Sequence, residues 1–181
     1  MHPTISDAVA DIVQNAFEAA AGWVELKMVR QGDALRVQVA DNGRGMDEQT
    51  LKRAMDPFWT EEGKHPGRKV GLGLPFLKQT MDQTGGILEM DTAPGRGTVV
   101  KFEFDLTNVD VPPLGDLAET LSGLMAYPGG HEFVVSRREE ARGYDVKRSE
   151  LRNALGGLES AGSLALMKQF FASNEEELVG K

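Results

Sequence analysis

Five short motifs within the first hundred residues constrain the fold of this chain more than any other feature. In chain order they are Asp11-Ile-Val-Gln-Asn15, Asp41-Asn-Gly-Arg-Gly45, Asp56-Pro-Phe-Trp-Thr60, Val70-Gly-Leu-Gly-Leu74 and Gly95-Arg-Gly-Thr98. The glycines in three of them permit tight turns and close approach of the backbone. Each motif alone is weak evidence, so the constraint comes from their order and spacing.

Apolar periodicity predicts helices over residues 5–21, 46–55 and 74–84. Thr4 or Ser6 would cap the first helix, and Pro75 falls in the first turn of the third, where a missing N–H is harmless. Alternating apolar residues predict two hairpins, with strands over 23–29, 35–39, 87–92 and 99–106. The expected fold class is α+β, a two-layer α/β sandwich whose mixed sheet carries helices on one face.

The paired prolines in residues 108–113 predict a boundary, with one domain over residues 1–107 and a small, mostly helical α/β extension over residues 108–181. In the extension we expect helices over 114–126, 146–155 and 163–178 and a strand over 132–136. Its apolar helix positions must be buried, either on the chain's own body or against a partner. These positions are Leu117, Leu121, Leu124, Leu164, Met167, Phe170 and Phe171.

Composition narrows the function classes. The net charge of -8 argues against a nucleic-acid surface. The chain has no cysteine, which excludes disulfides, thiolate metal sites and a cysteine nucleophile and suits the cytoplasm. No apolar stretch approaches the roughly 18 residues needed to span a bilayer, and the start lacks the layout of a signal peptide. We therefore expect a cytoplasmic protein without nucleic-acid or membrane partners.

The order and spacing of the motifs resemble those of the GHKL ATPases, the superfamily of gyrase, the heat-shock chaperone ATPase, histidine kinases and MutL-type mismatch-repair proteins. The stretch from Asp56 to Leu106 is the most specific part, because lid, glycine loop, helix, Gly-Gly stop and closing hairpin follow the order of the kinases. The resemblance implies the Bergerat ATP-binding fold over residues 1–107, with ATP and Mg²⁺ as ligands.

Asp11 and Asn15 are four residues apart and so share one face of the predicted first helix. A carboxamide oxygen is a suitable ligand for Mg²⁺, and the resemblance assigns this role to Asn15. An acid one turn earlier could orient or deprotonate an attacking water or hydroxyl, which makes Asp11 the candidate catalytic residue. The alternative for Asp11 is a simple interaction with the helix dipole.

Asp41 ends a predicted strand, and the resemblance implies that its carboxylate accepts a hydrogen bond from the adenine amino group. An ordinary turn is the alternative for this motif. Backbone amides after Gly71 would cradle phosphate at a helix start, with basic lid residues nearby, although a hinge and a solvated loop explain the same pattern. The complete set predicted to bind the nucleotide is Asn15, Asp41, Gly43, Gly45, Met46, Lys64, Arg68, Lys69, Gly71, Leu72, Gly73, Leu74 and Thr98.

The chain also departs from the kinase pattern. Sensor kinases carry a phosphoacceptor histidine on a preceding helical hairpin, and we expect none here, because His2 is terminal, His65 falls in the lid and His131 follows the ATP domain. The usual first strand has no counterpart, which would leave one sheet edge open. Either the strand near residues 133–135 or a second copy of the chain, in a homodimer, would cover that edge.

Two functions remain open. The first is an ATPase or protein kinase that transfers the γ-phosphoryl group to water or to a partner protein in trans, with Asp11 as base. The second is an ATP-gated, anti-sigma-like binding module that holds a protein partner through residues 108–181 with little turnover. A structural subunit with an empty pocket is disfavoured, since every motif keeps the residues that its chemistry requires.

Overall fold

The computed structural model describes residues 2–56 and 72–180. Over these residues, six strands form one mixed sheet in the order β3-β4-β2-β1-β5-β6. Only β1 and β5 are parallel, and the other neighbours are antiparallel. The elements are α1 (Ile5–Glu18), β1 (Trp23–Gln31), β2 (Ala34–Asp41), α2 (Glu48–Ala54), α3 (Gly73–Thr84), β3 (Ile87–Ala93), β4 (Gly97–Asp105), α4 (Leu117–Met125), β5 (Glu132–Glu139), β6 (Arg142–Lys147), α5 (Arg148–Leu155) and α6 (Ala161–Val179).

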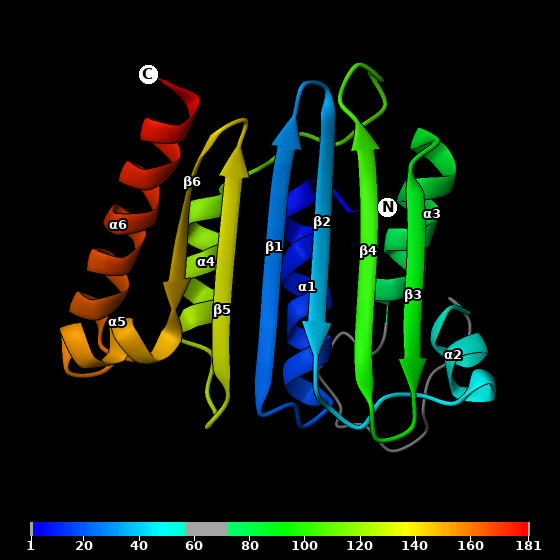
Figure 1. The fold of residues 1–181 in the computed structure, drawn as a ribbon, viewed down its shortest axis with the longest axis horizontal. Helices are drawn as coiled ribbons and strands as arrows, with labels where there is room; N and C mark the ends of the chain where they lie inside the picture. Colours follow the sequence, from blue (N-terminus) through cyan, green and yellow to red (C-terminus); the bar gives the residue numbers. More distant parts are fainter. Residues whose placement is uncertain (1, 57–71, 181) are drawn as a thin grey trace.

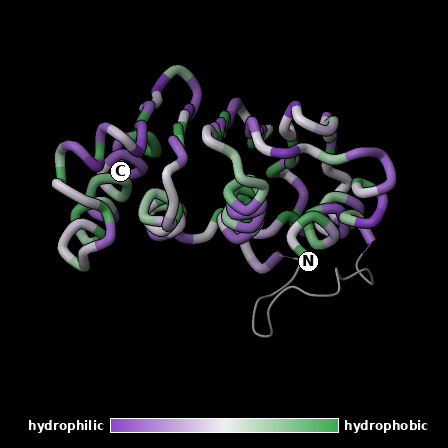
Figure 2. The backbone as a smooth tube through the Cα atoms, turned by 90° about the horizontal axis from the view of Figure 1, so that it is seen from below, coloured by the Kyte–Doolittle hydropathy of each residue, from purple (hydrophilic) through white to green (hydrophobic). Residues whose placement is uncertain are grey.

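The core lies between the sheet and a layer of helices on one of its faces. Helices α1, α3 and α4 lie behind the strands in Figure 1, and Figure 2 shows the two layers from below. Alternate residues of each central strand point into the core, such as Leu26 and Met28 of β1, while α1 contributes Val9 and Val13. The predicted fold class, an α+β two-layer sandwich, is confirmed.

The predicted first helix is confirmed, with its end corrected. The backbone N–H of Asp7 donates to Thr4 Oγ1 at 3.1 Å, so Thr4 is the N-cap. The helix ends at Glu18 instead of residue 21, because Ala20 takes a left-handed conformation with φ of 59°. Pro75 lies in the first turn of α3, as expected, and Gly85 ends that helix with φ of 67°.

The open edge of the sheet is covered by the chain itself. Strand β5 pairs in parallel with β1 over eight residues, from Trp23 opposite Glu132 to Arg30 opposite Glu139. Of the two predicted ways to cover that edge, the C-terminal strand is confirmed. One sheet and one core include residues from both sides of residue 108. The division of the chain into two domains at this residue stays a prediction.

Strand β6 corrects the prediction of a helix from residue 146. Residues 142–147 form an edge strand paired with β5, and α5 begins only at Arg148. The segment is short and alternates over only two large apolar residues, Tyr144 and Val146, so its strand signal is weak. The strand forms because pairing with β5 buries Val146.

Helix α6 packs against α4 along a narrow stripe that contains Met167 and Phe171, both fully buried. The expected burial of Leu117, Leu121 and Leu124 on α4 is confirmed. For Leu164 and Phe170 it is wrong on this chain, since they are 37% and 39% exposed. They lie on opposite flanks of the buried stripe.

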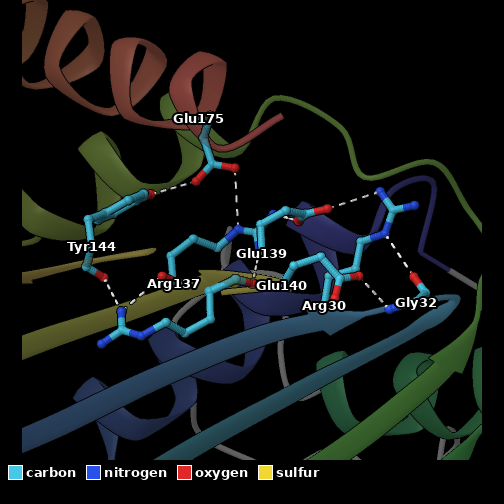
Figure 3. A network of polar contacts seen from close by, with 8 residues as sticks. Arg30, Gly32, Arg137, Glu139, Glu140, Tyr144 and Glu175 are labelled. Atoms are coloured by element: carbon cyan, nitrogen blue, oxygen red, sulfur yellow. Dashed lines mark hydrogen bonds and ion pairs between the residues drawn. The ribbon is translucent and has the colours of Figure 1, made fainter. Parts of the chain in front are cut away.

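A buried polar network joins α6 to the outer hairpin (Figure 3). The side chain of Arg137 is 5% exposed and contacts Glu139 at 2.7 Å and Glu175 of α6 at 3.3 Å. The Tyr144 hydroxyl donates to Glu175 at 2.6 Å, and burial together with that carboxylate raises the pKa of Tyr144. At the hairpin tips, the Gly32 N–H donates to Glu140 at 2.7 Å.

Arg148 closes the end of α4 onto the entrance to β5. This residue is 3% exposed, and its guanidinium donates to the carbonyl oxygens of Met125 at 2.8 Å, Tyr127 at 3.0 Å and His131 at 3.1 Å. The planar guanidinium of this one side chain thus supplies hydrogen-bond donors to three backbone carbonyls. The interaction thus sets the path of the chain between α4 and β5.

We expect Arg148→Lys to lower the free energy of unfolding by about 1–3 kcal/mol, since an ammonium cannot reach three diverging carbonyls. Urea denaturation measures this change. The matched control is Arg152→Lys, because the Arg152 side chain is 45% exposed and its substitution should change stability by less than about 0.5 kcal/mol. Equal effects of the two substitutions would contradict the bridging role of Arg148.

His131 predicts a pH dependence of stability. Its ring stacks on Phe17 at 4.0 Å, and burial, with the charges of Arg148 and Arg152, lowers the pKa of His131 below its ordinary 6.5. The unfolded chain therefore binds the proton more tightly, so this contribution to stability is complete above pH 6.5 and is lost as the pH falls through that value. In urea denaturation at several pH values, His131→Phe should lose less stability on acidification than the wild type.

Candidate functional site

A cavity of about 510 Å³ is lined by residues from the ends of β2 and β3 and from α2. Figure 1 shows these two strand ends at the same end of the sheet as α2. Helices α1, α2 and α3 and strands β2, β3 and β4 all contribute to its walls. The walls are mainly apolar, with Ile12, Val39, Leu74, Met90 and Val100 among them. Such walls around a few polar groups suit a flat aromatic ring whose edge carries hydrogen-bonding groups.

Asp41 is the acid on the cavity wall at the end of β2. Its Oδ1 accepts a hydrogen bond from the Gly43 N–H at 2.7 Å. Burial raises the pKa of Asp41 above its ordinary value, while hydrogen bonds from the backbone of Gly43 and Thr98 act in the opposite direction. A half-buried acceptor of this kind is suited to a ligand that donates a hydrogen bond.

The loop from Gly43 to Met46 is held tightly between the end of α1 and the β3–β4 turn. The Arg44 N–H donates to the carbonyl of Ala19 at 3.0 Å, and the Gly95 N–H donates to that of Arg44 at 2.7 Å. The Met46 N–H donates to Thr92 Oγ1 at 3.0 Å. Backbone geometry in this wall of the cavity is therefore fixed from both sides.

Gly45 is required in that loop for two reasons. Its φ is 64°, in the left-handed region, and a Cβ atom there would lie 1.9 Å from the carbonyl oxygen of Ala93. Gly32, in the β1–β2 turn, has a similar φ of 58°, but a Cβ atom on it would meet no heavy atom within 4 Å. Comparison of the two glycines therefore separates the cost of a left-handed φ from the cost of a close contact.

Gly45→Ala is expected to lower the free energy of unfolding by more than about 2 kcal/mol, because it combines an unfavourable φ with overlap against Ala93. Gly32→Ala has only the conformational cost and should lower it by roughly 1 kcal/mol. Urea denaturation of both variants gives the comparison. Equal losses would mean that the loop moves away from β3 without penalty.

Asn15 and Asp11 meet the start of α3 on one side of the cavity. Asn15 lines the cavity, and Asp11 lies one turn earlier on the same face of α1. A Cβ atom on Gly73 would lie 2.9 Å from Asp11 Cβ and 3.3 Å from Asn15 Nδ2. The glycine thus lets the first turn of α3 approach both polar side chains.

The structure brings most of the predicted nucleotide-binding residues to one place. Those that line the cavity are Asn15, Asp41, Gly45, Met46, Leu74 and Thr98. Gly43, Leu72 and Gly73 flank it, and so does Asp11, the predicted catalytic residue. Lys64, Arg68, Lys69 and Gly71 lie outside the described residues. Their roles in binding stay predictions.

Sequence reasoning missed several residues that line the cavity. Glu18 follows Asn15 by three positions on α1, a spacing that places it on the same side of the helix, and Arg44 sits inside the glycine motif itself. Asp47 and Thr50 come from the start of α2, whose N-cap is Asp47. Thr92 supports the wall from β3, and no local pattern around it signals this contact.

The family comparison matches residues 2–108 to the family described as histidine kinase-, DNA gyrase B- and HSP90-like ATPase. The match contains each of the motifs from Asp11 to Thr98. The chain belongs to this family. Membership implies that this domain binds ATP, and the GHKL resemblance is confirmed over this range.

Two curated relatives, a sensor kinase and an anti-sigma factor, are similar to this chain over its ATPase domain. Sensor histidine kinase YxdK of Bacillus subtilis is 33% identical over 101 residues, which cover 54% of this chain and 31% of the relative. Anti-sigma F factor of Thermoanaerobacter sp. is 27% identical over 98 residues, covering 54% and 63%. The chain therefore spans less than two thirds of either relative.

A solved structure resembles the fold beyond the ATPase match. The N-terminal domain of a DNA repair protein aligns with a TM-score of 0.54 over 89% of this chain and 58% of that one, at 17% identity. At this identity the likeness concerns the fold alone. Across residues 2–56 and 72–180, every helix is too short or too polar to cross a bilayer.

Proposed function

We propose that this protein is a Mg²⁺-dependent ATPase or protein kinase that transfers the γ-phosphoryl group of ATP to water or to a partner protein in trans. The observation that carries the proposal is the grouping of Asp11, Asn15 and Gly73 beside the cavity. This grouping brings an acid, a carboxamide and the start of a helix together beside a pocket that Asp41 also lines.

The residues present fit an adenine nucleotide. Asp41 is an acceptor within apolar walls, as the amino edge of adenine requires, and Thr98 lies opposite it in the neighbouring strand. In the first turn of α3, Pro75 has no N–H and the Phe76 N–H donates to the Leu72 carbonyl, which leaves the N–H groups of Gly73 and Leu74 to suit phosphate oxygens. Asn15 would hold the cation through its amide oxygen, and bound Mg²⁺ would neutralise charge on the phosphates.

Asp11 has the role of general base in this proposal. It stands one helical turn from the proposed cation ligand, and its side chain is 47% exposed, so a water or hydroxyl can reach it. Its carboxylate would accept the proton of the attacking group and orient it. In this proposal, Asn15 acts in cation binding and Asp11 acts in the chemical step.

An ATP-gated binding module is the second candidate, favoured by the exposed apolar residues of α6. Leu166 and Phe170 are 54% and 39% exposed and lie one turn apart on the same flank. A protein partner held by this flank, with ATP occupancy controlling its release, would give regulation with little turnover. The anti-sigma factor among the relatives makes this class of function a concrete alternative.

Two substitutions on α1 test the proposal with γ-labelled ATP. Asn15→Ala should abolish Mg²⁺-dependent nucleotide binding, measured by calorimetry. Asp11→Asn should keep binding and lower phosphate release or transfer by about 100-fold or more, since it removes the base alone. Gln14→Ala, on the exposed side of the same helix, is the matched control for both.

Full phosphate release by Asp11→Asn would contradict its role as base. Tight binding of ATP by the wild type, with neither release nor transfer, would instead support the binding module. In that case the affinity for a partner should change on addition of ATP, and Leu166→Ser should weaken it.

A further inference from the structure

The N-terminal segment places a histidine against the acid of the proposed site. His2 Nε2 lies 2.9 Å from Asp11 Oδ2. The His2 residue is 3% exposed, whereas the Asp11 side chain is 47% exposed. One end of this pair is therefore fixed inside the protein and the other end faces solvent.

The His2 ring packs against helix α3. The ring packs edge-on to Phe76 with centroids 5.9 Å apart, and the His2 N–H donates to Thr80 Oγ1 at 3.3 Å. Both residues belong to the helix whose first residue, Gly73, touches Asp11. Helix α3 thus positions the imidazole and the glycine against the same carboxylate.

The hydrogen-bond pattern indicates which imidazole nitrogen carries the proton. Nδ1 of His2 is buried and has no hydrogen-bond partner among the residues that the structure describes. A proton on Nδ1 would be a buried donor without an acceptor, whereas a proton on Nε2 is donated to Asp11. The geometry favours the tautomer with Nε2–H.

We propose that His2 is a positioning residue, which holds Asp11 by one carboxylate oxygen so that the other oxygen faces the attacking water or hydroxyl. In the described part of the chain, only His2 donates a side-chain hydrogen bond to Asp11, and it uses Oδ2. A carboxylate bound at one oxygen loses rotational freedom and keeps the second oxygen as acceptor. This inference rests on the proposed role of Asp11 as base.

If His2 only fills space between α1 and α3, as a plug, its substitutions should have different effects from those of a positioning residue. His2→Phe keeps an aromatic ring against Phe76 but removes the donor, and His2→Gln keeps a donor but removes the ring. If His2 positions Asp11, His2→Phe should lower kcat by about 10-fold or more with KM changed by less than about 2-fold. His2→Gln should recover part of that loss. A plug would give the opposite order, with His2→Phe close to the wild type.

The double variant separates the two proposals. In an Asp11→Asn background, His2→Phe should lower kcat no further, because both substitutions act through one group. If Asp11→Asn is inactive and His2→Phe is fully active, the positioning role fails while the proposed base stands. If Asp11→Asn is fully active, or the wild type shows no turnover, both proposals fail.

A spectroscopic measurement tests the pair without turnover. Imidazole ¹⁵N shifts of His2, assigned against His2→Gln at about pH 8.5, should show the Nε2–H tautomer. Asp11→Asn should move these shifts, and Asp82→Asn, a carboxylate-to-amide change at an exposed site of α3, should leave them in place. An Nδ1–H tautomer, or shifts insensitive to Asp11→Asn, would overturn the inference.

Discussion

The parallel pairing of β1 with β5 is the contact on which the rest of the structure depends. It makes β1 a central strand and brings the C-terminal hairpin into the sheet. Phe133 of β5 then meets Phe17 of α1 edge to face at 5.5 Å, and α4 packs beside α1. The helix that carries Asp11 and Asn15 is thereby held against residues from both halves of the chain. The packing of this helix therefore involves a strand more than a hundred residues away.

The cavity is built from close backbone approaches at one side and from side chains at the other. Gly45 approaches the carbonyl of Ala93, and Gly73 approaches Asp11. A side chain at either glycine would overlap with the segment that it faces. Between them, the half-buried carboxylate of Asp41 and the carboxamide of Asn15 line the cavity. The glycines of these motifs therefore set the distances between backbone segments around the cavity.

Local sequence signals predicted most of the fold and much of the cavity, because helix caps, alternation and glycine turns act over a few residues. Thr4, Pro75 and Gly85 all take their expected places. The misses are contacts between distant segments. Strand β6 depends on β5 for its register, Arg148 binds carbonyls about twenty residues earlier, and His2 reaches α3 across 78 positions. No pattern around any of these residues encodes its partner.

Strand β6 ends the sheet with a short edge that carries charges of both signs, from Arg142, Asp145 and Lys147. Charged, brief edge strands resist continuation by a strand from another molecule. Side chains near the edge are also engaged, since Arg138 binds Asp145 at 2.6 Å and Arg142 donates to the Glu177 carbonyl at 2.9 Å. Growth of the sheet from chain to chain, the route to fibrous aggregates, is therefore disfavoured at the edge that β6 forms.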